Sequence, residues 1–310
     1  MEKRVLGGTG IEVTDVGMGC WAIGGASFRD GIPSGWSGAN IDESLAVVKA
    51  AWDTGVTFYD TADAYGRGKS EVLVGYGLQD IKDQVVIATK AGNSLAGPGQ
   101  NFAEPYLRGA LDASLTRLEL ASVDVFQLHG PPVEEMTDEL FALMAELKAD
   151  GKFRSWGVSI SSTEEGIRAI EGGAEVIQLV YNILSQDVGR QILPLAQGRG
   201  VGVIARVPLA SGWLTGKYGA GTRFPDSDHR SRKFDAERAA RIAAQVDQLS
   251  FLLDEADTLA EAALRFTLSH PAVSTVIPGA KNREQLAQNV RASGKALSDG
   301  ALQRIEELFG

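Results

Sequence analysis

Short runs of apolar, mostly β-branched residues recur along the chain, and stretches with helical spacing separate them. Runs that stay apolar on both faces are typical of parallel strands covered on both sides. We predict eight such strands, at Asp15–Gly19, Thr57–Asp60, Val85–Thr89, Val123–Leu128, Ser155–Val158, Val176–Leu179, Val201–Ala205 and Ser274–Ile277.

The intervening segments carry apolar residues three and four positions apart, as one face of a helix does. Residues 42–53 place Leu45, Val48 and Trp52 on one stripe. Eight strand-then-helix units predict a (β/α)8 TIM barrel, an α/β fold that needs roughly 250 residues before insertions. A β-hairpin over residues 4–13 precedes the barrel, and extra helices are expected near 237–253 and 298–308. Because no Pro- or Ser-rich linker interrupts the chain, residues 1–310 are predicted to form a single domain.

Three long connections follow predicted strand ends, at residues 24–40, 91–101 and 208–235. Connections of this length are more often ligand-binding loops than simple linkers. All three follow the carboxyl ends of strands, which is the face where barrel active sites lie. We therefore expect a ligand site on that face.

Composition narrows the choice of partner. The 310 residues carry 40 acidic and 30 basic side chains, and the net charge of −10 argues against nucleic acid or anionic membranes as partners. No apolar run reaches the length of a membrane span, and Met1–Arg4 lead into no signal-peptide core. The lone Cys20 excludes an internal disulfide and suits a reducing compartment. A cytoplasmic protein with a small-molecule partner is expected, and nothing in the sequence marks its oligomeric state.

Polar or titratable residues end most of the predicted strands. Each of them alone could be a structural polar group with satisfied hydrogen bonds, but together they are improbable as packing alone. Barrel closure would bring them to one rim: Cys20, Trp21, Asp60, Lys90, His129, Ser159, Gln178, Arg206 and Gly279.

Tyr65 lies five residues beyond Asp60 and completes a set typical of acid–base chemistry. Positive charge on Lys90 would lower the tyrosine pKa from about 10 toward neutrality. Asp60 would hold that ammonium in place, and His129 would orient a polar oxygen. The alternative for Tyr65 is an ordinary loop tyrosine.

Two further segments are candidates for phosphate binding. Ile277–Gln285 joins the last strand to a helix and carries Lys281 and Arg283, and helix N-termini attract anions. Pro208–Lys217, with Arg223 close behind, could cover a pyrophosphate. The alternatives are solvated basic residues and a flexible surface loop.

Two motif matches lead elsewhere and are rejected. Gly17–Ala22 fits the Rossmann dinucleotide fingerprint, but no apolar helix follows it. Tyr65 and Lys69 have the spacing of the short-chain dehydrogenase pair, but Gly66 and Gly68 disfavour the helix that this pair requires. Neither paired histidine ligands nor a Gly-x-Ser-x-Gly elbow occurs, so metal-dependent and serine-hydrolase chemistry lack support.

Taken together, these segments closely resemble the aldo-keto reductases over nearly the whole chain. The resemblance implies NAD(P)H bound extended across the barrel rim, and reduction of aldehydes or ketones to alcohols. It implies catalytic roles for Asp60, Tyr65, Lys90 and His129, with Tyr65 as general acid, and substrate contact by Trp21, Tyr65 and His129. The resemblance rests on Leu6–Gly10, Phe58–Gly66 with Ser70 and Glu71, Thr89–Lys90, Gln127–His129, Gly157–Ser159, Gln178–Asn182, Pro208–Lys217 and Ile277–Asn289.

The resemblance also implies which residues hold the cofactor. Ser159 and Gln178 would hold the nicotinamide carboxamide, and Lys281 favours a 2′-phosphate, hence NADPH over NADH. Two departures stand out: Ile160 replaces an asparagine found in many members, and Arg206 replaces a tyrosine that stacks on the nicotinamide. The full expected set is Cys20, Trp21, Asp60, Ser159, Gln178, Arg206, Pro208, Leu209, Ser211, Gly212, Lys217, Arg223, Gly279, Lys281, Gln285 and Asn289.

Two other functions stay open at this point. A regulatory subunit could keep the fold and bind nucleotide with little turnover, and a phosphosugar enzyme could use the Lys281 region for substrate phosphate. The expected pocket wall of Trp21, Phe28, Trp36 and Tyr181 favours an apolar or aromatic acceptor. The sequence selects neither the substrate nor the physiological direction of reaction.

Overall fold

A computed structural model describes residues 1–95, 97 and 99–310, so Ala96 and Pro98 of the predicted 91–101 loop lie outside the described residues. One sheet holds eight strands in the order β12-β11-β10-β9-β8-β7-β6-β3, and all its pairings are parallel. The strands are β3 (Met18–Gly19), β6 (Phe58–Asp60), β7 (Val86–Ala91), β8 (Val123–His129), β9 (Phe153–Ser159), β10 (Val176–Val180), β11 (Gly202–Arg206) and β12 (Thr275–Val276).

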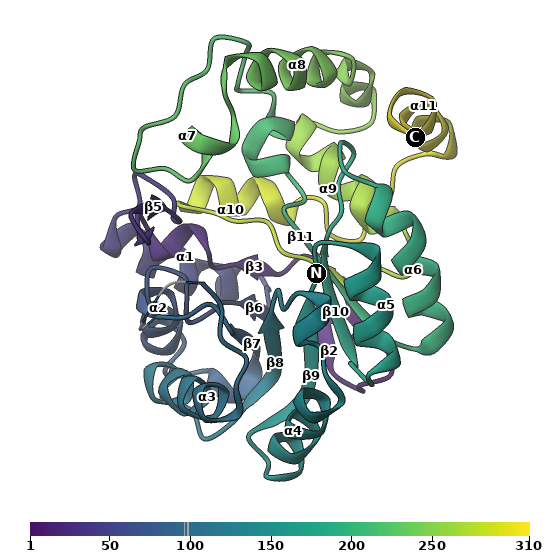
Figure 1. The fold of residues 1–310 in the computed structure, drawn as a ribbon. Coiled ribbons are helices and arrows are strands. Elements are labelled where there is room, and N and C mark those ends of the chain that lie inside the picture. The colour runs from purple at the N-terminus through teal and green to yellow at the C-terminus, as the bar shows by residue number, and fades with distance from the viewer. Residues whose placement is uncertain (96, 98) are drawn as a thin grey trace.

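The first and last strands of this sheet meet and close it. Parallel bridges join Val16 to Val276 and Gly19 to Gly279, and the Gly17 N–H donates to the Val276 carbonyl at 2.8 Å. Figure 1 shows the strands at the centre with helices around them. The predicted (β/α)8 barrel is confirmed, and each predicted strand overlaps an observed one.

The helices form the outer layer of the barrel (Figure 1). The expected 237–253 helix ends early, at Asp247, because the N–H groups of Gln248 and Leu249 bond three residues back and tighten the chain into a 3₁₀ turn. Among the described residues, no helix is long and apolar enough to cross a membrane. The helices are α1 (Ile41–Asp53), α2 (Lys69–Gly77), α3 (Glu104–Leu118), α4 (Asp138–Ala149), α5 (Thr163–Glu171), α6 (Asp187–Arg199), α7 (Arg230–Lys233), α8 (Ala236–Asp247), α9 (Leu259–Ser269), α10 (Arg283–Val290) and α11 (Asp299–Phe309).

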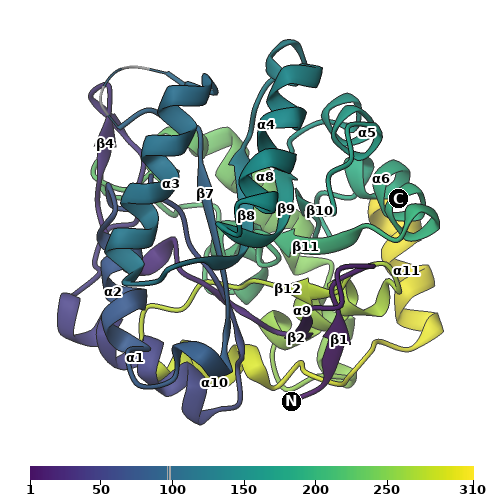
Figure 2. The ribbon, with the colours of Figure 1, turned by 90° about the horizontal axis from the view of Figure 1, so that it is seen from below.

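The predicted N-terminal hairpin is confirmed and plugs one end of the barrel. Strands β1 (Lys3–Val5) and β2 (Glu12–Thr14) pair antiparallel, and the Gly8 N–H donates to the Gly200 carbonyl just before β11. Leu6, Ile11 and Val13 join the apolar cluster inside the barrel. Figure 2 shows this hairpin and the β4 strand (Phe28–Arg29) at opposite ends of the molecule.

Strand alternation then decides which side chains reach the open end. Phe58, Ala88 and Val125 belong to the inner apolar cluster. Because side chains on a strand alternate between faces, residues two positions further along point inward as well. Those residues are Asp60, Lys90 and Gln127. The same rule places a polar layer directly above the apolar interior, at the carboxyl ends of the strands.

Candidate active site

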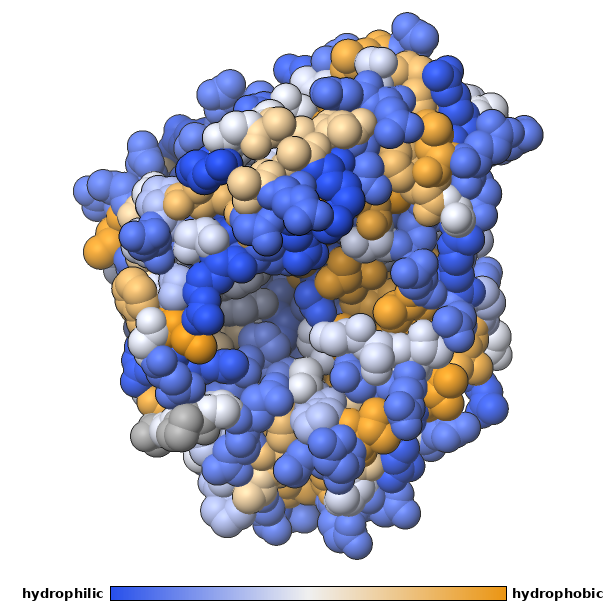
Figure 3. Space-filling model, turned by 45° about the horizontal axis from the view of Figure 1, so that its top comes forward, coloured by the Kyte–Doolittle hydropathy of each residue, from blue (hydrophilic) through white to orange (hydrophobic). Residues whose placement is uncertain are grey.

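A cavity of about 670 Å³ lies at the carboxyl ends of the strands, within the size range of small-molecule sites. Figure 3 shows the molecule hollowed near the centre of one face, with hydrophilic residues around much of the rim. The predicted site residues that line this cavity are Trp21, Asp60, Tyr65, His129, Ser159, Gln178, Arg206, Pro208, Leu209, Ser211, Gly212, Lys217, Gly279, Lys281, Gln285 and Asn289.

Three predicted site residues do not line the cavity. Lys90 is fully buried beneath it. Cys20 is fully buried and belongs to the larger apolar cluster, not to the cluster inside the barrel. Arg223 is exposed and donates to the Thr222 carbonyl, while Arg230 from the same connection lines the cavity instead.

The expected aromatic wall is only half correct. Trp21 and Trp36 line the cavity. Phe28 is 50% exposed on the β4 strand, and Tyr181 packs against Phe266 with ring centroids 5.5 Å apart. Both rings lie outside the cavity lining, so the pocket is less aromatic than the sequence indicated.

A buried chain of polar contacts starts at the Tyr65 hydroxyl. Lys90 Nζ lies 3.3 Å from Tyr65 Oη and 2.5 Å from Asp60 Oδ1, and it also donates to the Thr61 carbonyl. The Lys90 side chain is 0% exposed. A charge buried so deeply is stable only when it is paired and fully hydrogen bonded. These contacts therefore hold a positive charge directly beside the phenol.

Two glutamines complete the shell around Asp60. Gln178 Nε2 donates to Asp60 Oδ2 at 2.8 Å, and Gln127 Nε2 lies 3.2 Å from the same oxygen. Sequence reasoning missed Gln127, although it lies two positions before His129 and therefore on the same face of β8. With the Lys90 bond to Oδ1, these three hydrogen bonds hold the carboxylate by both of its oxygens.

Burial dominates the protonation of the phenol. It raises the Tyr65 pKa above its ordinary value, and the positive charge of Lys90 offsets only part of that rise. This reverses the expected lowering toward neutrality, because the sequence could not show how strongly burial opposes the charged form of the phenol. Tyr65 is therefore protonated across the physiological range and can act as a proton donor.

The neighbouring groups take defined charge states. Burial opposes the charge on Lys90, but Asp60 and Tyr65 raise its pKa above the ordinary value. Burial, Lys90 and Arg206 hold the His129 pKa well below the usual range, so its imidazole is neutral. The site thus presents a phenol, an ammonium and a neutral imidazole.

Two aromatic rings pack against Tyr65. The Trp21 ring stacks on Tyr65 with centroids 6.0 Å apart, and the His129 ring meets Tyr65 edge-on at 5.7 Å. These are the residues that the sequence indicated for substrate contact. They make one side of the reacting end of the cavity apolar.

The rest of the cavity suits an extended dinucleotide. At one end, Gln178 Oε1 is buried and has no hydrogen-bond partner among the described residues. This oxygen is free to accept a hydrogen bond from an amide N–H of a ligand. In the middle, Ala210, Ser211 and Gly212 have φ values of 47°, 60° and 95°. Successive left-handed residues turn backbone N–H groups into an anion-binding concavity. At the other end, Lys281 precedes the N-terminus of α10. The residues present fit a nicotinamide dinucleotide.

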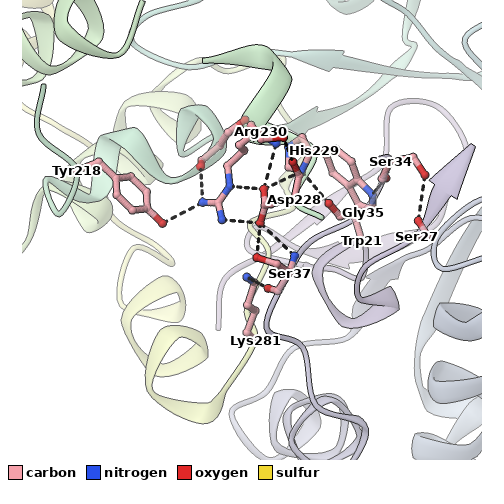
Figure 4. A network of polar contacts seen from close by, with 12 residues as sticks. Trp21, Ser27, Ser34, Gly35, Ser37, Tyr218, Asp228, His229, Arg230 and Lys281 are labelled. Carbon is pink, nitrogen blue, oxygen red and sulfur yellow. Dashed lines mark hydrogen bonds and ion pairs between the residues drawn. The ribbon is translucent and has the colours of Figure 1, made fainter. Parts of the chain in front are cut away.

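A second polar network ties the loop after β11 to the loop after β3 (Figure 4). Asp228 Oδ1 and Oδ2 accept from Arg230 Nε at 2.8 Å and Nη2 at 2.9 Å, and Oδ2 also accepts from the Ser37 N–H and hydroxyl. Lys281 Nζ donates to the Ser37 carbonyl at 2.6 Å. Burial opposes the Asp228 charge, but the Arg230 and Ser37 bonds hold its pKa well below the usual range. No sequence signal links residues 191 positions apart.

Asp63 is a buried acid of a different kind. It is 1% exposed, and neither of its carboxyl oxygens has a hydrogen-bond partner among the described residues. Burial and the nearby Glu71 raise the Asp63 pKa to about 7. The unfolded value is about 3.9. The native state therefore binds this proton more tightly, and stability is lost as pH rises from about 4 through 7.

We expect Asp63→Asn to be more stable than wild type at pH 8, by roughly 1–3 kcal/mol, because it removes an unpaired buried carboxylate. The gain should disappear near pH 4, where the wild-type acid is protonated. Urea unfolding at both pH values measures this. Asp80→Asn, at an exposed position, is the matched control. Loss of stability at pH 8 in Asp63→Asn would contradict the assignment.

Among the described residues, no group of three or more His, Cys, Asp and Glu side chains could hold a metal ion.

Comparison with known proteins places this site in a family. A sequence model of the Aldo/keto reductase family matches residues 15–309. Aldo-keto reductase YhdN of Bacillus subtilis is 31% identical, with 96% of this chain and 90% of that protein covered. A putative voltage-gated potassium channel subunit beta of Schizosaccharomyces pombe is also 31% identical, over 99% and 92% of the two chains.

The likeness extends to solved structures. The holo form of aldo-keto reductase AKR11C1 from Bacillus halodurans superimposes with a TM-score of 0.81 and 26% identity, covering 100% of this chain and 97% of that one. The sequence matches and the structural likeness indicate the same family. The chain therefore belongs to the aldo/keto reductase family of NAD(P)H-dependent oxidoreductases.

Proposed function

We propose that this protein reduces an aldehyde or ketone to the alcohol with NADPH, and that Tyr65 is the general acid. The observation that carries the proposal is the contact chain from Tyr65 Oη through Lys90 Nζ to Asp60 Oδ1, at 3.3 Å and 2.5 Å. It opens on a cavity that also holds His129 and Gln178.

The protein's part in the reaction is to manage one proton. When bound, the nicotinamide supplies the hydride that the carbonyl carbon receives. As the C=O bond opens, charge grows on the oxygen, and Tyr65 Oη transfers its proton there. The tyrosinate left behind is stabilised by the Lys90 ammonium, which Asp60 keeps charged and in place.

His129 positions the carbonyl oxygen. A neutral imidazole has one N–H to donate, and burial with the surrounding cations keeps His129 neutral. Donation toward the same oxygen that receives the Tyr65 proton stabilises the developing charge. Trp21, stacked on Tyr65, forms the apolar side of the reacting end.

The direct test is consumption of NADPH, followed by absorbance, with a panel of small aldehydes and ketones. We expect turnover with at least one class of carbonyl compound. Tight nucleotide binding with no consumption across the panel would favour the rival function, a regulatory subunit. A putative potassium channel subunit among the relatives favours the regulatory function. The complete set of four predicted catalytic residues argues against it.

The preference for NADPH depends on Lys281. Lys281 directly precedes Asn282, the N-cap of α10, and its ammonium donates to the Ser37 carbonyl at 2.6 Å. We expect Lys281→Ala to weaken NADPH binding roughly tenfold or more, since charge-assisted bonds contribute about 1.5–3 kcal/mol. NADH, which lacks the 2′-phosphate, should change less than about threefold by the same reasoning.

Fluorescence titration with both nucleotides measures the difference. Lys281→Arg keeps the charge and should keep most of the preference. Equal losses for NADPH and NADH in Lys281→Ala would remove Lys281 as the source of selectivity.

A further inference from the structure

A second cavity, of about 310 Å³, lies beside the first. The two cavities share the lining residues Trp21, Arg206, Val207 and Ser211. The remaining wall comes from the carboxyl end of β10, the loop after β11 and one side of α8, from Arg238 to Gln245. Arg206 therefore borders both the cavity that Tyr65 lines and this second space.

The second cavity is strongly positive in a chain whose net charge is −10. Arg206, Lys233, Arg238 and Arg241 line it, and no Asp or Glu does. None of the four cations forms an ion pair among the described residues. Acidic residues outnumber basic ones in the chain as a whole, so four cations that gather without an acidic partner are unexpected.

The cations are close enough to oppose one another. Burial lowers the Lys233 pKa, and the charges of Arg238 and Arg206 lower it further. Such repulsion costs stability unless an anion relieves it. Neighbouring His229 adds no charge, because burial brings its pKa to about 4.

Arg206 connects this cluster to the reacting groups. Its Nη2 donates to the Ile160 carbonyl at 3.0 Å and reaches Ser161 Oγ at 3.4 Å, which fixes the guanidinium between the cavities. Its Nε has no hydrogen-bond partner among the described residues. The guanidinium therefore forms no ion pair with an acidic side chain of the described residues.

The cofactor's phosphates have their own cations on another wall. Lys217 and Lys281 line the first cavity and not the second. The positive charge of the second cavity is thus left for a different anion, one that enters together with the carbonyl group.

We propose that the substrate is an aldehyde or ketone that carries an anionic group, a carboxylate or a phosphate, and that Arg206, Lys233, Arg238 and Arg241 bind this group in the second cavity. This inference rests on the proposed function and names its substrate class. The reaction is unchanged: the carbonyl carbon gains hydride, its oxygen gains the Tyr65 proton, and the anionic group takes no part in the chemistry.

The test compares matched substrates in wild type and Arg238→Gln/Arg241→Gln. Both positions are exposed on α8, and glutamine is a good helix former, so the variant should fold. Arg199→Gln/Arg232→Gln, which removes two exposed cations outside the cavity, is the control for net charge. The substrate pairs are succinic semialdehyde with butanal, and glyceraldehyde 3-phosphate with glyceraldehyde.

In wild type we expect kcat/KM to be at least tenfold higher for the anionic member of one pair, and the preferred pair tells carboxylate from phosphate. Arg238→Gln/Arg241→Gln should reduce that ratio about tenfold, mainly through KM, and leave the neutral aldehyde within twofold. Raising the salt concentration should also reduce it, because the rim charges are exposed to screening. The control variant should keep the wild-type ratio.

The two possible failures give different results. Turnover of the neutral aldehydes with equal or lower kcat/KM for both anionic partners overturns the anion site and leaves the proposed function intact. If neither these aldehydes nor the panel of small aldehydes and ketones is turned over, the proposed function fails, and calorimetry with succinate and inorganic phosphate then decides the site on its own. Binding that Arg238→Gln/Arg241→Gln abolishes supports it, and absence of binding overturns it.

Discussion

Replacing Tyr65 with phenylalanine should lower kcat for carbonyl reduction by about 10²–10⁴-fold, the range expected when a positioned general acid is lost. The substitution removes one oxygen and keeps the ring that stacks on Trp21 and meets His129. Lys90 keeps its bonds to Asp60 and to the Thr61 carbonyl, so the buried charge remains paired. The loss of kcat therefore measures the contribution of the proton donor and not a change in packing.

Single-turnover and steady-state rates with NADPH measure this effect. Nucleotide affinity should stay within a few-fold of wild type, because Tyr65 is not among the residues assigned to the pyrophosphate or adenosine ends. Tyr76→Phe, 54% exposed on α2, is the matched control and should behave as wild type. Near wild-type turnover in Tyr65→Phe with intact nucleotide binding would falsify the general-acid role.

Replacing Lys90 with methionine should destabilise the fold by roughly 3–5 kcal/mol as well as abolish efficient turnover. The reason is Asp60, which is 1% exposed and would be left as a buried carboxylate without its cation. Gln127 and Gln178 still donate to its other oxygen, but they carry no charge. Urea unfolding at pH 7 measures the loss.

The double variant Asp60→Asn/Lys90→Met separates charge from packing. It removes both members of the pair, so most of the lost stability should return, because a neutral pair of similar volume avoids the unpaired charge. Turnover should not return, since nothing then stabilises the tyrosinate. A double variant no more stable than Lys90→Met would mean that Asp60 is not the source of the destabilisation.

Much of the site was predictable because strand geometry is regular. Asp60, Lys90 and His129 each end an apolar run and Gln178 interrupts one near its end, and a parallel barrel brings such positions to one rim. The same regularity accounts for Gln127, which was overlooked although it shares the inward face of β8 with His129.

The loops were less predictable, because their side chains are placed by contacts between distant segments. Arg223 was expected near the cofactor, yet Arg230 lines the cavity instead, held by Asp228, which also binds Ser37 from 191 residues away. The single-domain assignment over 1–310 and the roles of the individual site residues stay predictions.

By itself, the order of apolar and polar residues determined the barrel, its hairpin and the groups that meet at its mouth, since period-two strands and helical stripes are local properties of the chain. Tertiary structure alone decided how those groups behave. Enclosure of Tyr65 raises its pKa where the neighbouring Lys90 by itself would lower it. Packing of α8 and the loop after β11 gathers Lys233, Arg238 and Arg241 beside Arg206. Burial and long-range electrostatics depend on which segments come together, and no local pattern records that.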